Sequence, residues 1–317
     1  NSMSSSLLIL PYFGKWPVWF DAHLLSIEKN PTINWLIITD CEIPQVYPKN
    51  ICFVKSTLSE LNFKVNRVVG AEIPLTPRKL CDLRPAYGNI FQEYLKNYDF
   101  WGFCDMDIIW GDIRKFITKD VLNSNDIISS RKESISGHFS LFRNTFIFNN
   151  LYKEIPNYIQ LFENEKLMRL DEEGFTQFIK QNTILYKLEG RIYWNSILLN
   201  QERGIDSWQG YYLDKWLWKD GKVLELNKEK VVNEVMYLHF ISWKSKMRKC
   251  QVDFKKYPNM FYISYNVIKE EKHDLLFKKL NNLKNLFYGF WIRENLRVKK
   301  KRFKKKFKTV LNRIYER

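Results

Sequence analysis

An apolar segment that ends in two aspartates limits the folds open to this chain more than any other part of the sequence. The run Tyr98–Cys104 is largely apolar, and Asp105 and Asp107 follow it, one residue apart, before Ile108–Trp110. Such a run is typical of a buried strand in an α/β sheet. Side chains at i and i+2 point the same way, so the two carboxylates should converge at the strand end. Like charges this close need a cation or a shared proton, which predicts a divalent-metal site at the carboxyl edge of a sheet.

The flanking segments predict an α/β fold. Strands are expected at Leu7–Leu10, Trp35–Thr39 and Ile51–Val54, with a helix at Trp19–Lys29 between the first two and a helix at Ser56–Val65 after the third. This succession of short strands and helical connections indicates a parallel or mixed sheet flanked by helices. No glycine-rich phosphate loop follows the first strand, which argues against dinucleotide and P-loop sites. Further along, we expect a helix over Tyr152–Arg169 and β segments at Tyr186–Tyr193, Tyr211–Leu217 and Lys222–Leu226.

The charge is unevenly distributed. The chain has 317 residues, with 45% hydrophobic and 16% aromatic content, enough for one large domain and an appendage. Of the net charge of +16, residues 270–317 carry +11, from 16 Lys/Arg against 5 Asp/Glu. We therefore expect a disordered N-terminus or tag remnant at 1–6, a catalytic domain at 7–265 and a basic tail at 266–317.

The tail has an amphipathic pattern. Leu276, Leu280, Leu283, Phe287, Phe290 and Trp291 fall on one helix face, and a Lys/Arg cluster at 299–306 alternates with Phe303, Phe307, Val310, Leu311 and Ile314. A basic amphipathic helix of this kind binds an anionic membrane surface. Nucleic-acid binding is the competing interpretation of a lysine cluster. A tail that is merely solvated, without a binding function, is the third interpretation. The apolar stripe favours a membrane or a partner helix.

The cysteines and hydropathy indicate a location. The five cysteines are scattered, without the spacing of a disulfide framework or a zinc site, which fits a reducing cytoplasm. Neither a signal peptide nor an apolar run long enough to span a membrane is expected. With the basic tail, this predicts a cytoplasmic protein that is peripheral on the inner face of the cytoplasmic membrane.

A second stretch supplies further candidate ligands. The apolar run from Val235 delivers His239, and Lys244 and Lys246 follow five and seven residues later. Histidine is a frequent metal ligand and lysine a point charge for phosphate, so in a chain with an aspartate pair this pattern predicts a metal–diphosphate site. A packed core histidine is the alternative.

Two clusters of charged residues, one of mixed sign and one acidic, stand where helices are expected to begin. Lys79, Asp82 and Arg84 precede Pro85, and the helix they open leads into the Asp105 strand, so the cluster is a candidate for the same cleft. A solvated first turn is the alternative. Asp171 and Glu172 open a later helix, where acids also complement the helix dipole.

Three segments carry a family resemblance: Lys79–Gly88, Trp101–Asp112 and Gly137–Asn144. With them, the chain resembles GT-A-type glycosyltransferases of bacterial capsule or O-antigen polysaccharide synthesis, over about residues 7–250. The resemblance implies a GT-A (Rossmann-like) mixed sheet flanked by helices. It also implies metal-dependent transfer of a hexose, such as galactose or glucose, from a UDP-sugar to a saccharide or lipid-linked saccharide.

The resemblance also assigns roles to residues. Asp105, Asp107 and His239 would hold Mn²⁺ or Mg²⁺ on the donor diphosphate, with Lys244 and Lys246 reaching the same group. The residues expected around the nucleoside are Pro11, Tyr12, Phe13 and Asp40, those on the donor-sugar side are Lys79, Asp82 and Arg84, and those towards the acceptor are Gly137, His138, Asp171 and Glu172.

The residue types suit this chemistry. A cation and lysines stabilise the charge that builds on the leaving diphosphate. An inverting enzyme also needs a carboxylate base, for which Asp171, Glu172 and Asp112 are candidates, whereas a retaining enzyme does not.

Other classes fit less well. A phosphohydrolase would use Asp105 as nucleophile and Asp107 as acid, but such enzymes usually have Thr or Val two residues after the second Asp, where this chain has Ile109. A nucleic-acid-binding protein is disfavoured because the excess charge lies in the tail. A non-catalytic scaffold with a decayed site is disfavoured by the intact aspartate pair and His239.

Overall fold

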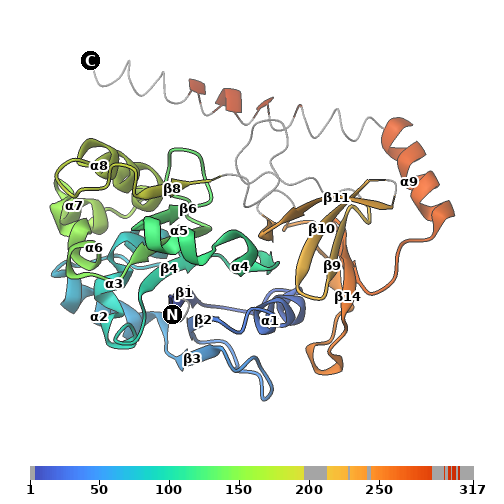
Figure 1. Cartoon of the computed structure of the whole chain (residues 1–317), viewed down its shortest axis with the longest axis horizontal. Coiled ribbons are helices and arrows are strands. Elements are labelled where there is room, and N and C mark those ends of the chain that lie inside the picture. The colour runs from blue at the N-terminus through green and yellow to red at the C-terminus, as the bar shows by residue number, and fades with distance from the viewer. Residues whose placement is uncertain are drawn as a thin grey trace. The chain divides into compact units, whose positions relative to one another are not determined.

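The computed structural model describes residues 4–195, 213–227, 229–240 and 244–287, with short pieces between 296 and 307. The chain divides into two compact units, Asn1–Glu270 and Glu271–Arg317. Each unit is described by itself below, and Figure 1 shows the elements of both.

The first unit is built on a seven-stranded mixed sheet in the order β3-β2-β1-β4-β7-β6-β8. Its strands are β1 (Ser6–Tyr12), β2 (Ile33–Thr39), β3 (Ile51–Lys55), β4 (Phe100–Cys104), β6 (Ile127–Ser129), β7 (Phe139–Arg143) and β8 (Ile192–Trp194). Strands β1 to β4 run parallel, whereas β7 is antiparallel to both β4 and β6. The predicted α/β class with a mixed sheet flanked by helices is confirmed.

Helices cover this sheet (Figure 1). They are α1 (Phe20–Glu28), α2 (Leu58–Val69), α3 (Tyr87–Ile90), α4 (Ile113–Phe116), α5 (Lys119–Ser124), α6 (Phe146–Asn150), α7 (Tyr158–Glu163) and α8 (Phe175–Gln181). Shorter helical turns are η1 (Lys79–Ala86), η2 (Gln92–Tyr94), η3 (Leu151–Glu154), the π-helical η4 (Leu170–Gly174) and η6 (Phe254–Lys256).

Local sequence explains where these helices begin and end. Thr57 and Glu60 form a capping box at the start of α2, and Gly70 ends that helix in the left-handed region at φ 75°. The single helix predicted over Tyr152–Arg169 is wrong. Pro156 cannot donate a backbone hydrogen bond and Asn157 has φ 58°, so the segment divides into η3 and α7.

The core explains why β4 lies at the centre of the sheet. All five residues of β4 are buried, and Trp101 stacks on Phe142 of β7. Gly102 allows this pairing, because a Cβ there would lie 2.1 Å from the carbonyl oxygen of Ser140. Burying each large apolar side chain contributes about 1.5–3 kcal/mol. The end of β4, where Asp105 follows, is therefore fixed by tight packing.

A second sheet of six strands completes the first unit, in the order β11-β10-β9-β14-β15-β13. Its strands are β9 (Trp216–Lys219), β10 (Lys222–Asn227), β11 (Lys230–Val235), β13 (Lys249–Cys250), β14 (Met260–Ile263) and β15 (Val267–Lys269). Strands β5 (Ile108–Trp110) and β12 (Tyr237–His239) form a separate short antiparallel pair; in the chain, β5 follows β4 of the first sheet and β12 follows β11 of the second. Trp218 donates a hydrogen bond from Nε1 to the Trp110 carbonyl at 3.0 Å, which joins the second sheet to this pair.

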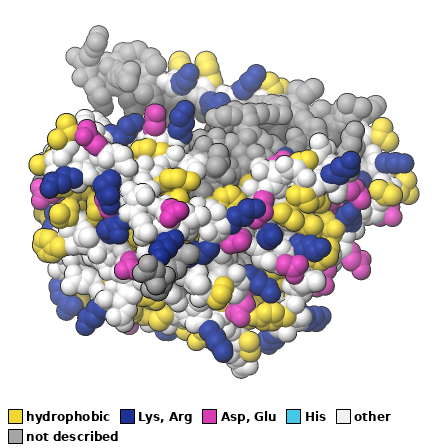
Figure 2. Space-filling model, in the orientation of Figure 1, with side chains coloured by type: hydrophobic (Ala, Val, Ile, Leu, Met, Phe, Trp, Pro, Cys, Tyr) yellow, Lys and Arg dark blue, Asp and Glu magenta, His cyan; other side chains and the backbone are white. Residues whose placement is uncertain are grey.

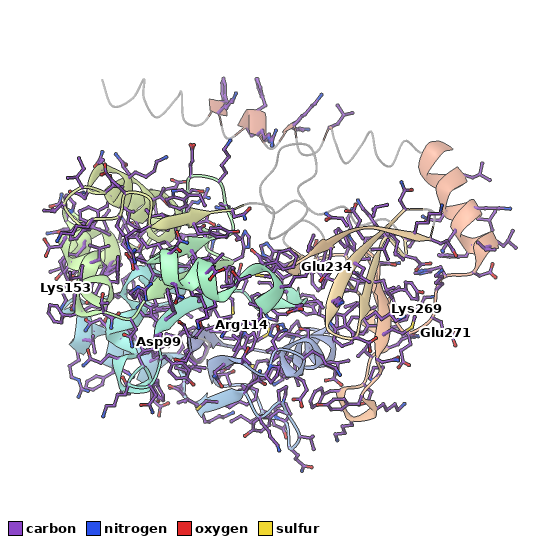
Figure 3. The ribbon with its side chains drawn as sticks, viewed as in Figure 1. Asp99, Arg114, Lys153, Glu234, Lys269 and Glu271 are labelled. Carbon is purple, nitrogen blue, oxygen red and sulfur yellow. The ribbon has the colours of Figure 1, made fainter. Side chains whose placement is uncertain are left out.

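The fold begins earlier than residue 7. Ser6 is the first residue of β1, and the Ser5 backbone N–H donates to Asp99 Oδ2 at 2.8 Å. Arg114 donates to the Ser4 carbonyl at 3.0 Å, and Figure 3 labels both Asp99 and Arg114. Because these bonds order Ser4 and Ser5, the expectation of a disordered segment through residue 6 is corrected.

The second unit contains helix α9 (Leu275–Phe287). Short helical pieces follow around Arg302–Lys304 and Lys306–Phe307. Five residues that the sequence places on the apolar stripe lie outside the described residues: Phe290, Trp291, Val310, Leu311 and Ile314. Within the part of the chain that is described, none of the helices has both the length and the apolarity needed to cross a membrane.

Candidate active site

Two carboxylates and one imidazole meet at the carboxyl end of β4. Asp105 and Asp107 follow that strand, and the pairing of β12 with β5 places His239 opposite Ile108. His239 Nε2 lies 3.4 Å from Asp105 Oδ2 and 3.3 Å from Asp107 Oδ1. One ligand atom from each of the three side chains falls within 4.8 Å of the others. The structure thus brings together the three residues that the sequence nominated as metal ligands.

The charges of this cluster are balanced by its neighbours. Burial disfavours a charged His239, but Asp107 and Asp105 outweigh this and raise its pKa to about 9. Burial would also raise the pKa of Asp107, yet His239 and Lys244 hold it well below its usual range. Lys244 Nζ lies 2.9 Å from Asp107 Oδ2. The ion pair with Arg84 and the contact with His239 likewise lower the pKa of Asp105 against the effect of burial.

The donor set fits a divalent cation. Carboxylate oxygens suit Mg²⁺ and Mn²⁺, and a neutral imidazole adds a nitrogen ligand of the kind that first-row transition metals accept. Asp105 keeps 28% of its side chain exposed while Asp107 and His239 are buried, so one side of the cluster is open to a ligand. His239 must release its proton to coordinate a metal, because its pKa lies above neutrality.

Arg84 connects this cluster to a second acidic group. Its guanidinium pairs with Asp105 and also donates to Asp171 Oδ2 at 2.9 Å. Burial raises the pKa of Asp171 to about 6, although Arg84 opposes that shift. Gly137 makes this arrangement possible: a Cβ there would lie 2.6 Å from the Arg84 guanidinium and 2.8 Å from Asp171 Oδ2.

Glu172 is held by positive neighbours. It pairs with Arg131 at 2.8 Å and Arg169 at 2.6 Å, and it accepts a hydrogen bond from the Gly137 backbone N–H at 3.2 Å. Burial opposes its ionisation, but the two arginines lower the pKa of the Glu172 carboxyl. Arg131 was not predicted as a site residue, because it stands in a polar loop without a recognisable motif.

His138 lies against His239 and is held by a tyrosine. The two rings stack with centroids 4.3 Å apart, and His138 Nδ1 lies 2.6 Å from the hydroxyl of Tyr237. That hydroxyl also donates to Ser130 Oγ at 2.6 Å. Burial and the charge of His239 set the pKa of His138 well below its ordinary value, so the ring is neutral. Tyr237 was missed, although it is two residues from His239 on a strand and period 2 places both on one face.

A cavity of about 430 Å³ opens beside the cluster. Of the residues predicted around the donor, those that line it are Pro11, Tyr12, Arg84, Asp105, Asp107 and Lys244. Pro17 and Trp19 line it as well, and Trp19 is fixed by a hydrogen bond from Nε1 to the Met106 carbonyl at 2.9 Å. Neither Pro17 nor Trp19 had been predicted from the sequence as a site residue.

Lys79 and Asp82 lie behind the cavity wall. Their side chains are 2% and 0% exposed and pair at 2.8 Å. Asp82 also accepts hydrogen bonds from the backbone N–H groups of Met168 and Leu170, each at 2.9 Å. Through these contacts the pair holds η1 against the start of η4, and neither side chain is among the described residues that line the cavity. Their expected place on the donor-sugar side stays a prediction.

The remaining candidates have local structural contacts. Asp40 accepts a hydrogen bond from the Gly14 backbone N–H at 2.8 Å, which shapes the loop after β1. Phe13 packs against the core instead of lining the cavity. Asp112 caps α4 by accepting from the Lys115 backbone N–H at 3.2 Å. Lys246 is not among the described residues that line the cavity.

Together, the fold and the cluster define an α/β protein with two carboxylates and an imidazole gathered at the carboxyl edge of a mixed sheet. The chain belongs to the family described as a family of unknown function (DUF6625), whose model matches residues 8–272. Comparison with curated proteins gave no significant match.

Several solved structures are similar to this chain. The galactosyltransferase LgtC, in complex with donor and acceptor sugar analogues, is 9% identical with a TM-score of 0.34, over 60% of this chain and 72% of that one. The bifunctional glycosyltransferase WbbM is 10% identical with a TM-score of 0.36, over 62% of this chain and 40% of that one. The glycosyltransferase GlyE of Streptococcus pneumoniae TIGR4 is 12% identical with a TM-score of 0.32, over 63% of this chain and 47% of that one.

Proposed function

We propose that this protein is a metal-dependent glycosyltransferase that moves a hexose, such as galactose or glucose, from a UDP-sugar to a saccharide or lipid-linked saccharide of a surface polysaccharide. The observation that carries the proposal is the convergence of Asp105, Asp107 and His239 beside an open cavity. The resemblance of three sequence segments to GT-A-type enzymes supports the same reaction class.

The chain supplies the charge that this reaction needs. Asp105, Asp107 and His239 would hold Mn²⁺ or Mg²⁺. The bound cation would neutralise the negative charge that develops on the leaving diphosphate. The Lys244 ammonium, 2.9 Å from Asp107 and 54% exposed, adds a positive charge on the same side. Arg84 lines the cavity and, held by Asp171, directs its guanidinium towards the site.

Asp171 and Glu172 are assigned to the acceptor side. With a pKa of about 6, Asp171 is ionised at neutral pH, so in an inverting reaction it accepts the proton of the acceptor hydroxyl. In a retaining reaction it remains the positioning partner of Arg84. The anomeric configuration of the product, read by NMR, distinguishes the two.

Donor binding and hydrolysis test the proposal. UDP should raise the melting temperature only when Mn²⁺ or Mg²⁺ is present, and one nucleotide sugar from a screen should be hydrolysed in a metal-dependent way. Asp107→Asn should reduce that hydrolysis about 100-fold or more, because a ligand carboxylate is lost. The matched control is Asp120→Asn, an exposed residue in the first turn of α5. A wild-type protein that responds to no nucleoside diphosphate would sink the proposal.

Nucleic acid is the weaker alternative for the first unit. Figure 2 shows Lys and Arg side chains mixed with Asp and Glu over the described surface of one face, without a continuous basic patch there. A non-specific nucleic-acid site is usually a basic patch or stripe.

We further propose that the tail unit binds the anionic inner face of the cytoplasmic membrane. Helix α9 exposes Leu276, Leu280 and Leu283, and the later Phe303 and Phe307 are exposed and stacked with centroids 6.3 Å apart. Exposed apolar side chains beside clustered lysines suit a surface of anionic lipid.

Vesicle sedimentation tests the membrane proposal. Vesicles containing phosphatidylglycerol should sediment the full chain at low salt, and deletion of residues 271–317 should remove most of that binding. Vesicles of phosphatidylcholine alone are the control. Equal binding by the truncated protein would refute the proposal.

A further inference from the structure

We propose that this protein has a second binding site, for an anionic saccharide, at the edge of the main sheet opposite to the Asp105–Asp107 cluster. A cavity of about 570 Å³ lies there, within the volume range of small-ligand sites. It is lined by residues of α2, α3, η2, the loop before β4, the turn after β7 and α6. Lys96 precedes β4 whereas Asp105 follows it, so the two sites lie at opposite ends of this strand.

A network of amides builds the floor of this cavity. Trp101 donates from Nε1 to Asn149 Oδ1 at 2.7 Å, and Asn149 Nδ2 donates to Asn144 Oδ1 at 2.8 Å. Asn144 Nδ2 in turn donates to the carbonyls of Leu95 and Tyr98, both at 2.8 Å. These bonds fix the amides before any ligand arrives, which lowers the cost of ordering on binding.

The cavity carries an excess of positive charge and of hydrogen-bond donors. Lys64, Arg67 and Lys96 line it with a single acid, Glu93, which pairs with Lys64. Within the described part of the chain, Arg67 and Lys96 have no ion pair. Asp99, close to Lys96 in sequence and labelled in Figure 3, already accepts hydrogen bonds from Ser5. Guanidinium and ammonium groups with excess donors select carboxylate or phosphate.

Exposed aromatic rings beside the cavity favour a sugar as the carrier of that charge. Phe63 is 72% exposed and stands one helical turn from Arg67, and Phe146 is 83% exposed and stands one turn from Asn149. Neither ring lines the cavity itself, but residues three or four apart share a helix face, so each ring stands next to a residue that does. A flat ring next to the donors of Arg67 and Lys96 matches the apolar face and the hydroxyls of a pyranose.

The position indicates what the site would do. It is separated from the Asp105 cluster by the length of β4, about 16 Å at 3.3 Å per residue. A nucleotide sugar held at the Asp105 cluster has no use for a binding site at the other end of β4, whereas an extended acceptor can occupy both ends. The assignment of the ligand as an acceptor saccharide rests on the proposed transferase function, but the selection of an anion rests on the charges alone.

Binding of small anionic saccharides tests this site in the full chain. The probes are trigalacturonic acid and glucose 6-phosphate, with neutral maltotriose and a single-stranded DNA oligonucleotide for comparison, followed by calorimetry at low salt. The test variant combines Arg67→Glu with Lys96→Glu, both exposed. The matched control combines Lys222→Glu with Lys230→Glu, which are exposed on the second sheet.

The outcomes separate the alternatives. We expect at least one anionic probe to bind, about tenfold or more weakly in the test variant and unchanged in the control. The proposal is overturned if neither anionic probe binds the wild type, if maltotriose binds equally well, if the test variant binds normally, or if DNA is the preferred ligand. Stabilisation by UDP with Mn²⁺, measured on the same samples, should be equal in all three proteins. Its absence throughout would refute the transferase and leave anion binding standing.

Discussion

The buried Lys79–Asp82 pair gives the sharpest test of how the cavity wall is built. Asp82 is 0% exposed and its Oδ2 accepts from both Lys79 Nζ and the Met168 backbone N–H, while Oδ1 accepts from the Leu170 backbone N–H. In Asp82→Asn, an amide NH₂ must face at least one of these donors. The Lys79 ammonium, 2% exposed, also loses its only carboxylate among the described residues. An uncompensated buried charge costs about 3–5 kcal/mol, so we expect the free energy of unfolding to fall by that amount.

Urea unfolding followed by tryptophan fluorescence measures this loss. The control is Glu133→Gln, whose partner Lys180 lies 4.0 Å away with both side chains about half exposed or more, and it should change stability by less than about 1 kcal/mol. Folded Asp82→Asn protein should still bind UDP with Mn²⁺, because the pair does not line the cavity. Unchanged stability together with lost donor binding would refute the reasoning and return Asp82 to the donor-sugar side.

Three further perturbations address the site directly. Gly137→Ala should affect the rate of metal-dependent hydrolysis more strongly than the free energy of unfolding, because the new Cβ would lie 2.6 Å from the Arg84 guanidinium. A variant that hydrolyses the donor at the wild-type rate would contradict this. Since His239, with a pKa of about 9, must lose its proton to bind a metal, Mn²⁺ affinity measured by calorimetry should rise up to about tenfold per pH unit between pH 7 and 9; a flat profile would exclude His239 as a ligand. Tyr237→Phe removes the hydroxyl that holds His138, and should cost about 1–3 kcal/mol in thermal unfolding while leaving UDP binding intact.

The parallel half of the sheet could be predicted because its signals are local. Each of the strands β1, β2 and β3 is a short apolar run, and helix α1 between β1 and β2 is the kind of crossover that parallel neighbours need. The second sheet could not be assembled in the same way. Its strand β9 pairs with β14, about 40 residues later in the chain, and the sequence contains no signal for that pairing.

The site was predictable to the extent that it follows strand periodicity. The spacing of Asp105 and Asp107 after a buried strand predicted two of the candidate ligands, and the apolar run before His239 predicted the third, which β12 brings beside β5. The roles of Lys79 and Asp82 were not predictable, because a charged cluster at a helix start looks the same whether it faces a cavity or is buried against η4. Only the contacts of Asp82 with Met168 and Leu170 decide that.

The balance of charge at the cluster predicts how metal and nucleotide bind together. Without a metal, the two aspartates are already paired with Arg84, His239 and Lys244, so a divalent cation alone must displace groups that are well placed. A nucleoside diphosphate brings new negative charge, to which Arg84 and Lys244 can turn once the metal holds the carboxylates. Mn²⁺ should therefore bind more tightly in the presence of UDP, by a coupling of about 1–3 kcal/mol, and UDP more tightly in the presence of Mn²⁺ by the same factor. Calorimetric titrations in both orders measure this coupling. Independent binding of the two would show that Arg84 and Lys244 do not exchange partners.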